Sequence, residues 1–279
     1  MKKIFVGSFL IIGYCVNAQS IGNSPYASYG IGDVKYDNTT ETRAMGGIST
    51  AYISEFPNSF NFKNPAANEN LELTSFRLEA TNENNFFKSG RTDAKYTKHS
   101  TYLSNISIAF PLSPKLKFGL GYQPYSSKNY NVVQTESLAD GTTKANNFSG
   151  EGSLNTVQAA FSYKIAEEFS IGLRTNYYFG SITDKDEITT SDAELINGYE
   201  TNLNVNNFNF TAGATYQKKY GNDRRLTLGA TSTFGNTTNL TTNYTNSTYY
   251  YSSVLEKVQE SIIEEKEGNS KNLLPAEFS

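Results

Sequence analysis

The chain has very few of the residues on which common enzyme chemistry depends. Its 279 residues include one Cys, one His and no Trp. This composition argues against cysteine nucleophiles and the usual Cys and His zinc clusters. The single histidine, His99, lies in a polar stretch near Asp93 and Ser100, and neighbouring polar residues do not form a catalytic triad without the right geometry. We therefore expect a protein that is not an enzyme and uses no metal or cofactor.

Charge and long apolar runs are also scarce. Charged residues make up 18% of the chain and the net charge is -3, which offers no basic surface for nucleic acid. After residue 18, no stretch approaches the roughly 20 apolar residues that a transmembrane helix needs. The acidic groups at 184–187 and 264–267 lack the spacing of a calcium-binding loop, so we expect solvated loop charges there.

The first 18 residues have the pattern of a secretory signal peptide. Lys2 and Lys3 precede an apolar run at 4–16, and Val-Asn-Ala at 16–18 forms a small-residue cleavage site. The run is too short to span a bilayer as a helix. Cys15 could mark a lipoprotein, but the preceding Tyr14 is bulkier than the small residue that such sites have. Cleavage after residue 18 would export a chain without cysteine, which can form no disulfide.

The main positive signal is a pattern that returns three times after residue 110, with a period of about 53 to 55 residues. Each unit has a polar turn, apolar residues at every second position and a long polar stretch. After the first turn, for example, Phe118 and Leu120 take one face of a strand while Gly119 and Gly121 take the other. A soluble β-sandwich also alternates, so the pattern alone leaves both architectures open.

Three observations together favour an outer-membrane β-barrel: the signal peptide, a 14% aromatic content, and short turns that alternate with long polar stretches. The polar stretches, expected to be external loops, lie at 126–153, 181–204 and 236–261. We expect an all-β, antiparallel, transmembrane barrel built from residues 71–279 in the outer membrane of a Gram-negative bacterium. Its strands are predicted near 72–81, 101–112, 115–126, 154–165, 168–180, 205–218, 224–236 and 259–273.

Residues 19–70 do not alternate and are rich in Gly and Pro, which mark turns and close approaches of the backbone. Phe56, Phe60 and Phe62 are predicted to form an aromatic cluster that leaves water. We interpret the segment as a plug that folds inside the barrel, with Arg43 and Asn64 hydrogen-bonded to polar wall residues. Five glycines on the predicted inner face would let its backbone approach: Gly119, Gly121, Gly172, Gly213 and Gly229. Alternatively, these glycines only relieve curvature of the barrel.

Two short motifs in this segment resemble the N-terminal hatch of the FadL family of outer-membrane transporters for long-chain fatty acids and hydrocarbons. They are Arg-Ala-Met-Gly-Gly at 43–47 and Asn-Pro-Ala at 64–66. The resemblance implies a 14-stranded barrel with a lumenal hatch, of which this chain would hold about eight strands. The chain would then be incomplete beyond Ser279, and the alternative is a complete eight-stranded barrel. The positions that match the hatch pattern, to which we assign a structural role, are Arg43, Gly46, Gly47, Asn64, Pro65 and Ala66.

The sequence thus leads to two hypotheses of function. The first, which rests on the resemblance, is facilitated diffusion of hydrophobic small molecules across the outer membrane, with Phe56, Phe60 and Phe62 as ligand contacts. The second is a non-transporting barrel that serves as a structural or accessory subunit of an outer-membrane or protein-secretion assembly. The expected partners are outer-membrane lipid, an apolar ligand and other outer-membrane proteins.

Overall fold

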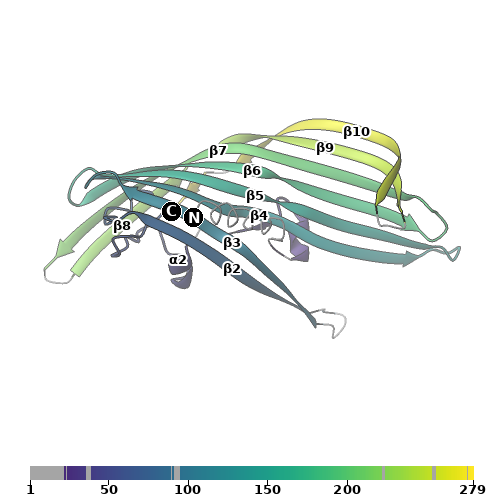
Figure 1. Ribbon diagram of the computed structural model, residues 1–279, viewed down its shortest axis with the longest axis horizontal. Helices are drawn as coiled ribbons and strands as arrows, with labels where there is room; N and C mark the ends of the chain where they lie inside the picture. The colour runs from purple at the N-terminus through teal and green to yellow at the C-terminus, as the bar shows by residue number, and fades with distance from the viewer. Residues whose placement is uncertain are drawn as a thin grey trace, which may run out of the picture.

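The computed structural model is dominated by one antiparallel sheet (Figure 1). The structure describes residues 22, 24–35, 39–88, 90, 95–221, 224–252, 256–274 and 276–279. The predicted signal peptide at 1–18 lies outside these residues. Along the main path of the sheet the strands follow the order β10-β9-β7-β6-β5-β4-β3-β2. The prediction of an all-β antiparallel fold is confirmed. Within the described residues, no helix is both long enough and apolar enough to cross a membrane.

The strands are long, and each of the eight expected strands overlaps an observed one. The bounds are β2 Ser75–Lys88, β3 Lys95–Pro111, β4 Leu116–Ser137, β5 Thr143–Lys164, β6 Phe169–Thr190, β7 Ile196–Tyr220, β8 Arg224–Thr233, β9 Asn236–Tyr251 and β10 Lys257–Leu274. Two short strands, β1 (Asp33–Val34) and β11 (Glu277–Phe278), pair with β4 and β8. The hairpins meet at a short-turn end, which includes 112–115 and 165–168, and at a far end, which includes 138–142 and 191–195.

The prediction of long external loops is wrong. The polar stretches at 126–153 and 181–204 are mainly the continuations of β4, β5, β6 and β7, and the stretch at 236–261 contains β9. The β4 and β5 ladder runs from Leu116 opposite Tyr163 to Ser137 opposite Thr143. Because each neighbour supplies hydrogen-bond partners for the backbone, Asn- and Thr-rich sequence forms strand here without an apolar face.

β8 and β9 are two parts of one course through the sheet. β8 pairs with residues 211–220 of β7, and β9 pairs with residues 196–205 of the same strand. Both therefore lie along the same edge of β7, and the break at Phe234 and Gly235 separates them. β10 and β11 follow β9 and β8 in the same way. Within the described residues, β2 and β10 are the two ends of the main path and do not pair with each other.

The two faces of the sheet near the short-turn end have opposite characters, as the alternation predicts. Leu120, Phe161 and Leu173 are exposed on the outer face. Lys117 and Arg174 on the inner face are buried, at 4% and 5% exposure. A soluble sheet would bury its apolar face, so the exposed apolar face fits a lipid environment.

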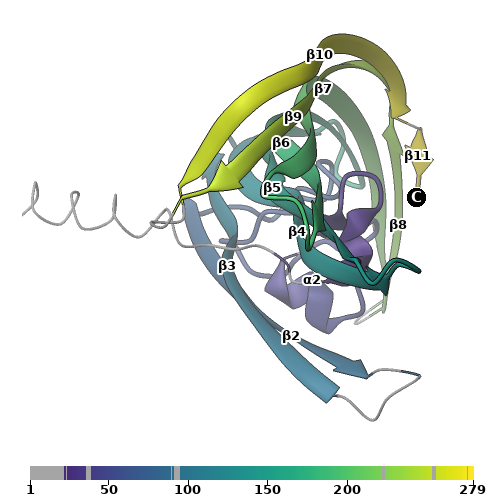
Figure 2. The same ribbon diagram turned by 90° about the vertical axis from the view of Figure 1, so that its right-hand side faces the viewer.

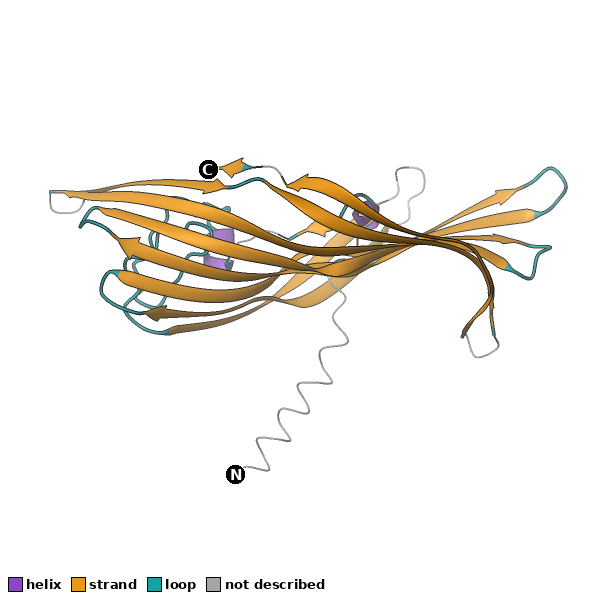
Figure 3. Ribbon diagram, turned by 90° about the horizontal axis from the view of Figure 1, so that it is seen from above, coloured by secondary structure: helices purple, strands orange, loops and turns teal. Residues whose placement is uncertain are grey.

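The N-terminal segment covers the inner face. Figure 2 shows the sheet curling around this segment, which is drawn in purple. The segment contains the 3₁₀ helix η2 (Pro25–Ser28) and the helix α2 (Thr40–Ala44), each capped by the side chain of the residue before it. Figure 3 shows both short helices beneath the long strands. A buried cluster joins segment and sheet through Phe60, Phe62, Leu71, Ala109 and Ala160.

Candidate functional site

The N-terminal segment packs against the inner face of β4 to β8. Asn64 and Ala66 are completely buried there, at 0% exposure, and Pro65 is fully buried between them. The Asn64 side chain donates to the carbonyl oxygens of Thr50 (2.6 Å) and Ala214 (3.4 Å). Its own oxygen accepts from the Ala66 amide at 3.0 Å. Asn64 therefore fixes the local fold and joins it to β7.

Glycines of the sheet make the close approach of this segment sterically feasible. A Cβ on Gly172 would lie 2.3 Å from the carbonyl carbon of Pro65, and one on Gly213 would lie 2.2 Å from the Asn64 side-chain oxygen. Real Cβ atoms do not approach other atoms so closely. The smallest residue is therefore required at both positions because another part of the chain occupies the space.

The same relation holds at the other three inner-face glycines. Gly119 lies under the Phe60 ring, Gly121 under the Phe62 ring, and Gly229 against the Thr50 carbonyl. All five glycines singled out in the sequence thus face the N-terminal segment. This contact accounts for them better than relief of curvature alone.

Polar groups of the sheet also bind the backbone of the segment. Arg174 donates to the Phe62 carbonyl at 2.9 Å. The Ser162 and Thr215 hydroxyls donate to the Ala66 carbonyl at 3.4 and 3.3 Å. These donors come from β5, β6 and β7, so the loop at 62–66 is bound by three adjacent strands.

The other predicted hatch residues lie at the rim of this interface. Arg43, at the end of α2, is exposed and donates to the Thr81 hydroxyl of β2 at 3.2 Å. Gly46 and Gly47 have φ of 78° and 86°, a conformation that favours glycine. The prediction that Arg43 and Asn64 bond polar residues of the wall is confirmed for Arg43, through the Thr81 hydroxyl, and is wrong for Asn64, whose side chain donates to backbone carbonyls. Each residue of the loop and of the adjoining strand carries a backbone carbonyl, so acceptors for the Asn64 side chain are available close by.

The three phenylalanines do not form one cluster. Phe60 and Phe62 are each 5% exposed and meet edge to face at 4.8 Å, but Phe56 is 63% exposed. Alternation of polar and apolar residues cannot place side chains in an irregular segment, so the sequence did not separate Phe56 from the others. A role for these rings as ligand contacts stays a prediction.

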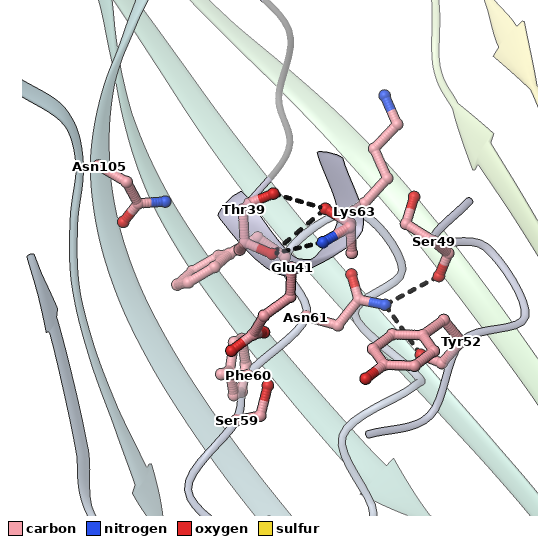
Figure 4. Close-up of a pocket in the computed structure, with 11 residues that line it drawn as sticks. Thr39, Glu41, Ser49, Tyr52, Ser59, Phe60, Asn61, Lys63 and Asn105 are labelled. Carbon is pink, nitrogen blue, oxygen red and sulfur yellow. Dashed lines mark hydrogen bonds between the residues drawn. The ribbon is translucent and has the colours of Figure 1, made fainter. Parts of the chain in front are cut away.

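Little open space remains where the segment folds back on itself. Figure 4 shows Asn61 donating to the carbonyls of Ser49 (2.8 Å) and Tyr52 (3.1 Å) beside Phe60. Asn68 also donates to the Asn61 carbonyl at 2.9 Å. The cavity in this region has a volume of about 20 Å³, roughly the space of one water molecule. Asn61 and Asn68 were missed in the sequence because asparagines are common throughout this chain.

A second group of side chains, at the far end of the sheet, was expected to be solvated loop charge. Glu187 lies instead within β6 and accepts hydrogen bonds from the side chains of Tyr249, Asn147 (2.9 Å) and Tyr251 (3.0 Å). Burial raises its pKa, but these bonds and the charge of Lys185 outweigh burial and hold the pKa of Glu187 below its usual value of 4.5. The pairing of β5 with β6 places Asn147 opposite Glu187, and the pairing of β9 with β7 brings Tyr249 and Tyr251 to the same carboxylate.

Comparison with known proteins identifies a family. A protein-family model described as BamG matches residues 1–279, the whole chain. No curated protein and no solved structure matches the chain. BamG is a family related to the assembly of barrels in the outer membrane of Gram-negative bacteria. The predicted localisation in that membrane agrees with this match, and so does the expectation of outer-membrane protein partners.

The resemblance to the FadL family, and the fatty-acid transport inferred from it, are wrong. The family match covers the whole chain and is to a different family. The physical reason lies in the motifs themselves. Asn-Pro-Ala at 64–66 lies flat against Gly172 and Gly213, and small or cyclic residues suit any backbone that packs this closely against a sheet. Such short motifs therefore indicate that the backbone packs closely against a sheet, and they do not distinguish a transporter from another protein.

Proposed function

Because this chain belongs to the BamG family, we propose that it is a non-transporting structural or accessory subunit of an assembly of outer-membrane proteins. The match over residues 1–279 is the observation that carries the proposal. The partners are other outer-membrane proteins, and the chemistry is recognition without catalysis.

The half of the sheet at the short-turn end spans the membrane. Its outer face presents Val157, Phe161, Ile171, Leu173 and Phe210, each between 40% and 47% exposed. A strand needs about ten residues to cross the hydrocarbon core, and the exposed apolar residues occupy a band of that length. The short-turn end faces the periplasm in this arrangement, as is usual for outer-membrane barrels.

Residues 19–70 act as a plug that supports the wall from inside. The support for this role is the set of contacts from the segment to β4, β5, β6, β7 and β8. A wall bound to a buried segment through glycine contacts and backbone hydrogen bonds is rigid, which suits a scaffold for other proteins.

The proposal is tested by depleting the protein in cells and restoring it from a plasmid. We expect that depletion lowers the amounts of folded outer-membrane proteins, measured as heat-modifiable bands and by quantitative mass spectrometry. Uptake of a labelled long-chain fatty acid should change no more than these losses explain. Slower uptake together with normal amounts of every other outer-membrane protein would contradict the proposal.

A further inference from the structure

The strands are about twice as long as a membrane requires. β4, β5 and β6 have 22 residues each, against roughly ten for a membrane-spanning strand. The half of the sheet toward 138–142 and 191–195, which we call the far half, therefore projects beyond the bilayer. Its exposed surface is available to neighbouring molecules in the aqueous phase.

The far half contains a cavity of about 380 Å³ between β6, β7, β9 and β10. We call it the outer far pocket. Its lining includes Lys185, Glu187, Glu200, Tyr249, Lys257 and Glu265.

The outer far pocket opens on the face of the sheet opposite the N-terminal segment. Lys185 and Glu187 are separated from Leu173 by even numbers of residues, and the register of β6 with β5 and β7 is unbroken between them. Successive strand residues point to opposite faces, so all three side chains share the outer face. Arg174, which binds the N-terminal segment, belongs to the inner face. The plug therefore leaves this pocket open to an external partner.

Carboxylates outnumber lysines in the pocket. Lys185 binds Glu151 at 3.1 Å, and Lys257 lies 3.9 Å from Glu200 and 4.1 Å from the centre of the Tyr249 ring. Each lysine thus already has a carboxylate beside it. Glu265 has no ion pair among the described residues, and it is exposed. The pocket consequently keeps a negative potential at its mouth, which favours a cation and repels phosphate groups.

We infer that the outer far pocket docks an external loop of a neighbouring outer-membrane protein, and that this loop carries Lys or Arg. The inference rests on the proposed function, which supplies the class of partner. The pocket offers the charge that such a side chain needs, because Glu200 and Glu265 place two carboxylates in its lining. The Tyr249 ring is 2% exposed and lies against the Lys257 ammonium, so it belongs to the pocket wall and offers no free aromatic surface. Arginine is enriched in protein interfaces, where it pairs with carboxylates. The phosphates of lipopolysaccharide would meet an excess of carboxylate.

The experiment uses the full chain in living cells, with a photo-reactive amino acid in place of Ile262, which lines the pocket and is 53% exposed. The control site is Val133, which is 60% exposed on β4 and does not line the pocket. We expect Ile262, and not Val133, to cross-link to another outer-membrane protein. Peptide mass spectrometry should place the link in an external loop, next to Lys or Arg.

Charge variants test the specificity of the contact. Glu200→Gln with Glu265→Gln should reduce the cross-link yield about threefold to tenfold, and added salt should have a similar effect. Glu136→Gln, an exposed change of the same kind on β4, should leave the yield unchanged. Because these changes are nearly isosteric and lie at the surface, they should preserve folding, which the amount of heat-modifiable protein verifies.

Several results would overturn the inference. These are links from Ile262 only to lipopolysaccharide or to a second copy of this chain, the absence of any link, or a link that is indifferent to Glu200 and Glu265. Such a result, combined with a loss of outer-membrane proteins on depletion, refutes the pocket and leaves the proposed function standing. If depletion leaves those proteins unchanged as well, both are refuted.

Discussion

Replacing Gly172 with Ala should detach the N-terminal segment from β6. The added methyl group would lie 2.3 Å from the carbonyl carbon of Pro65 and 2.5 Å from the amide nitrogen of Ala66, whereas ordinary van der Waals contact begins at 3.4 Å. The loop must therefore retreat by about 1 Å, because both neighbours are backbone atoms and cannot rotate away.

The free energy lost in the attachment of the segment can be estimated from the overpacking and from the hydrogen bonds that this movement breaks. Overpacking of a close-fitted interior costs about 1 to 3 kcal/mol. The hydrogen bonds that Ser162 and Thr215 donate to the Ala66 carbonyl are already long, at 3.4 and 3.3 Å, and their loss adds about 1 kcal/mol each. We expect a total loss of roughly 3 to 5 kcal/mol in the attachment of the segment.

A graded series measures this effect. Gly119→Ala should cost less than Gly172→Ala because its neighbour is the Phe60 ring, which can shift, and Gly121→Ala should cost little because the Phe62 ring is 3.2 Å away. Gly268→Ala is the matched control, since its nearest neighbour is at 3.8 Å. The assay is the rate at which a protease cuts residues 39–70 in folded protein in detergent, together with the unfolding midpoint. Equal protection of the Gly172→Ala and Gly268→Ala variants would refute the reasoning.

Three further outcomes are expected. Asn64→Ala should lower the free energy of unfolding by about 2 to 3 kcal/mol, because buried acceptors lose their donor, and an unchanged urea midpoint would contradict this. Leu173→Lys on the outer face should cost about 2 to 4 kcal/mol on folding into lipid vesicles, whereas Ser181→Lys, on the same face nearer the far end, should cost close to nothing. The lowered pKa of Glu187 contributes stability above its usual value of 4.5, and this stability is lost as the pH falls through the folded pKa. Acid should therefore speed proteolysis at 191–195, and Glu187→Gln should make the rate of proteolysis less dependent on pH. If the rate depended on pH equally in both proteins, the stabilising role assigned to ionised Glu187 would be wrong.

The approximate positions of eight strands could be predicted from the sequence, as could the faces of those near the short-turn end. Strand side chains alternate whatever the strand pairs with, so Leu120 and Lys117 reveal their opposite faces locally. The close approach of residues 19–70 to Gly172 and Gly213 could also be predicted, although the individual residues in contact could not. A glycine in a strand indicates a close approach of other backbone but does not identify the residue that makes the contact.

The far half could not be predicted, because its polar stretches carry no apolar alternation. Residues 236–251 form β9 because residues 196–205 of β7 on one side and β10 on the other supply hydrogen-bonding edges. The cluster around Glu187 depends on two pairings, since Asn147 comes from β5, the partner of β6, and Tyr249 and Tyr251 come from β9, the partner of β7. No signal within the stretch itself indicates these contacts.

The sequence by itself determined the properties that each residue imposes on its own neighbourhood: the alternation of the strands, the turns between them and the small residues at close contacts. The tertiary structure alone decided which residues fill the space above each glycine, how far the strands extend and which charges meet at the far end. The physical reason is that backbone pairing and burial of polar groups depend on partners distant in the chain. Their free energy is shared between two segments and is encoded in neither one alone.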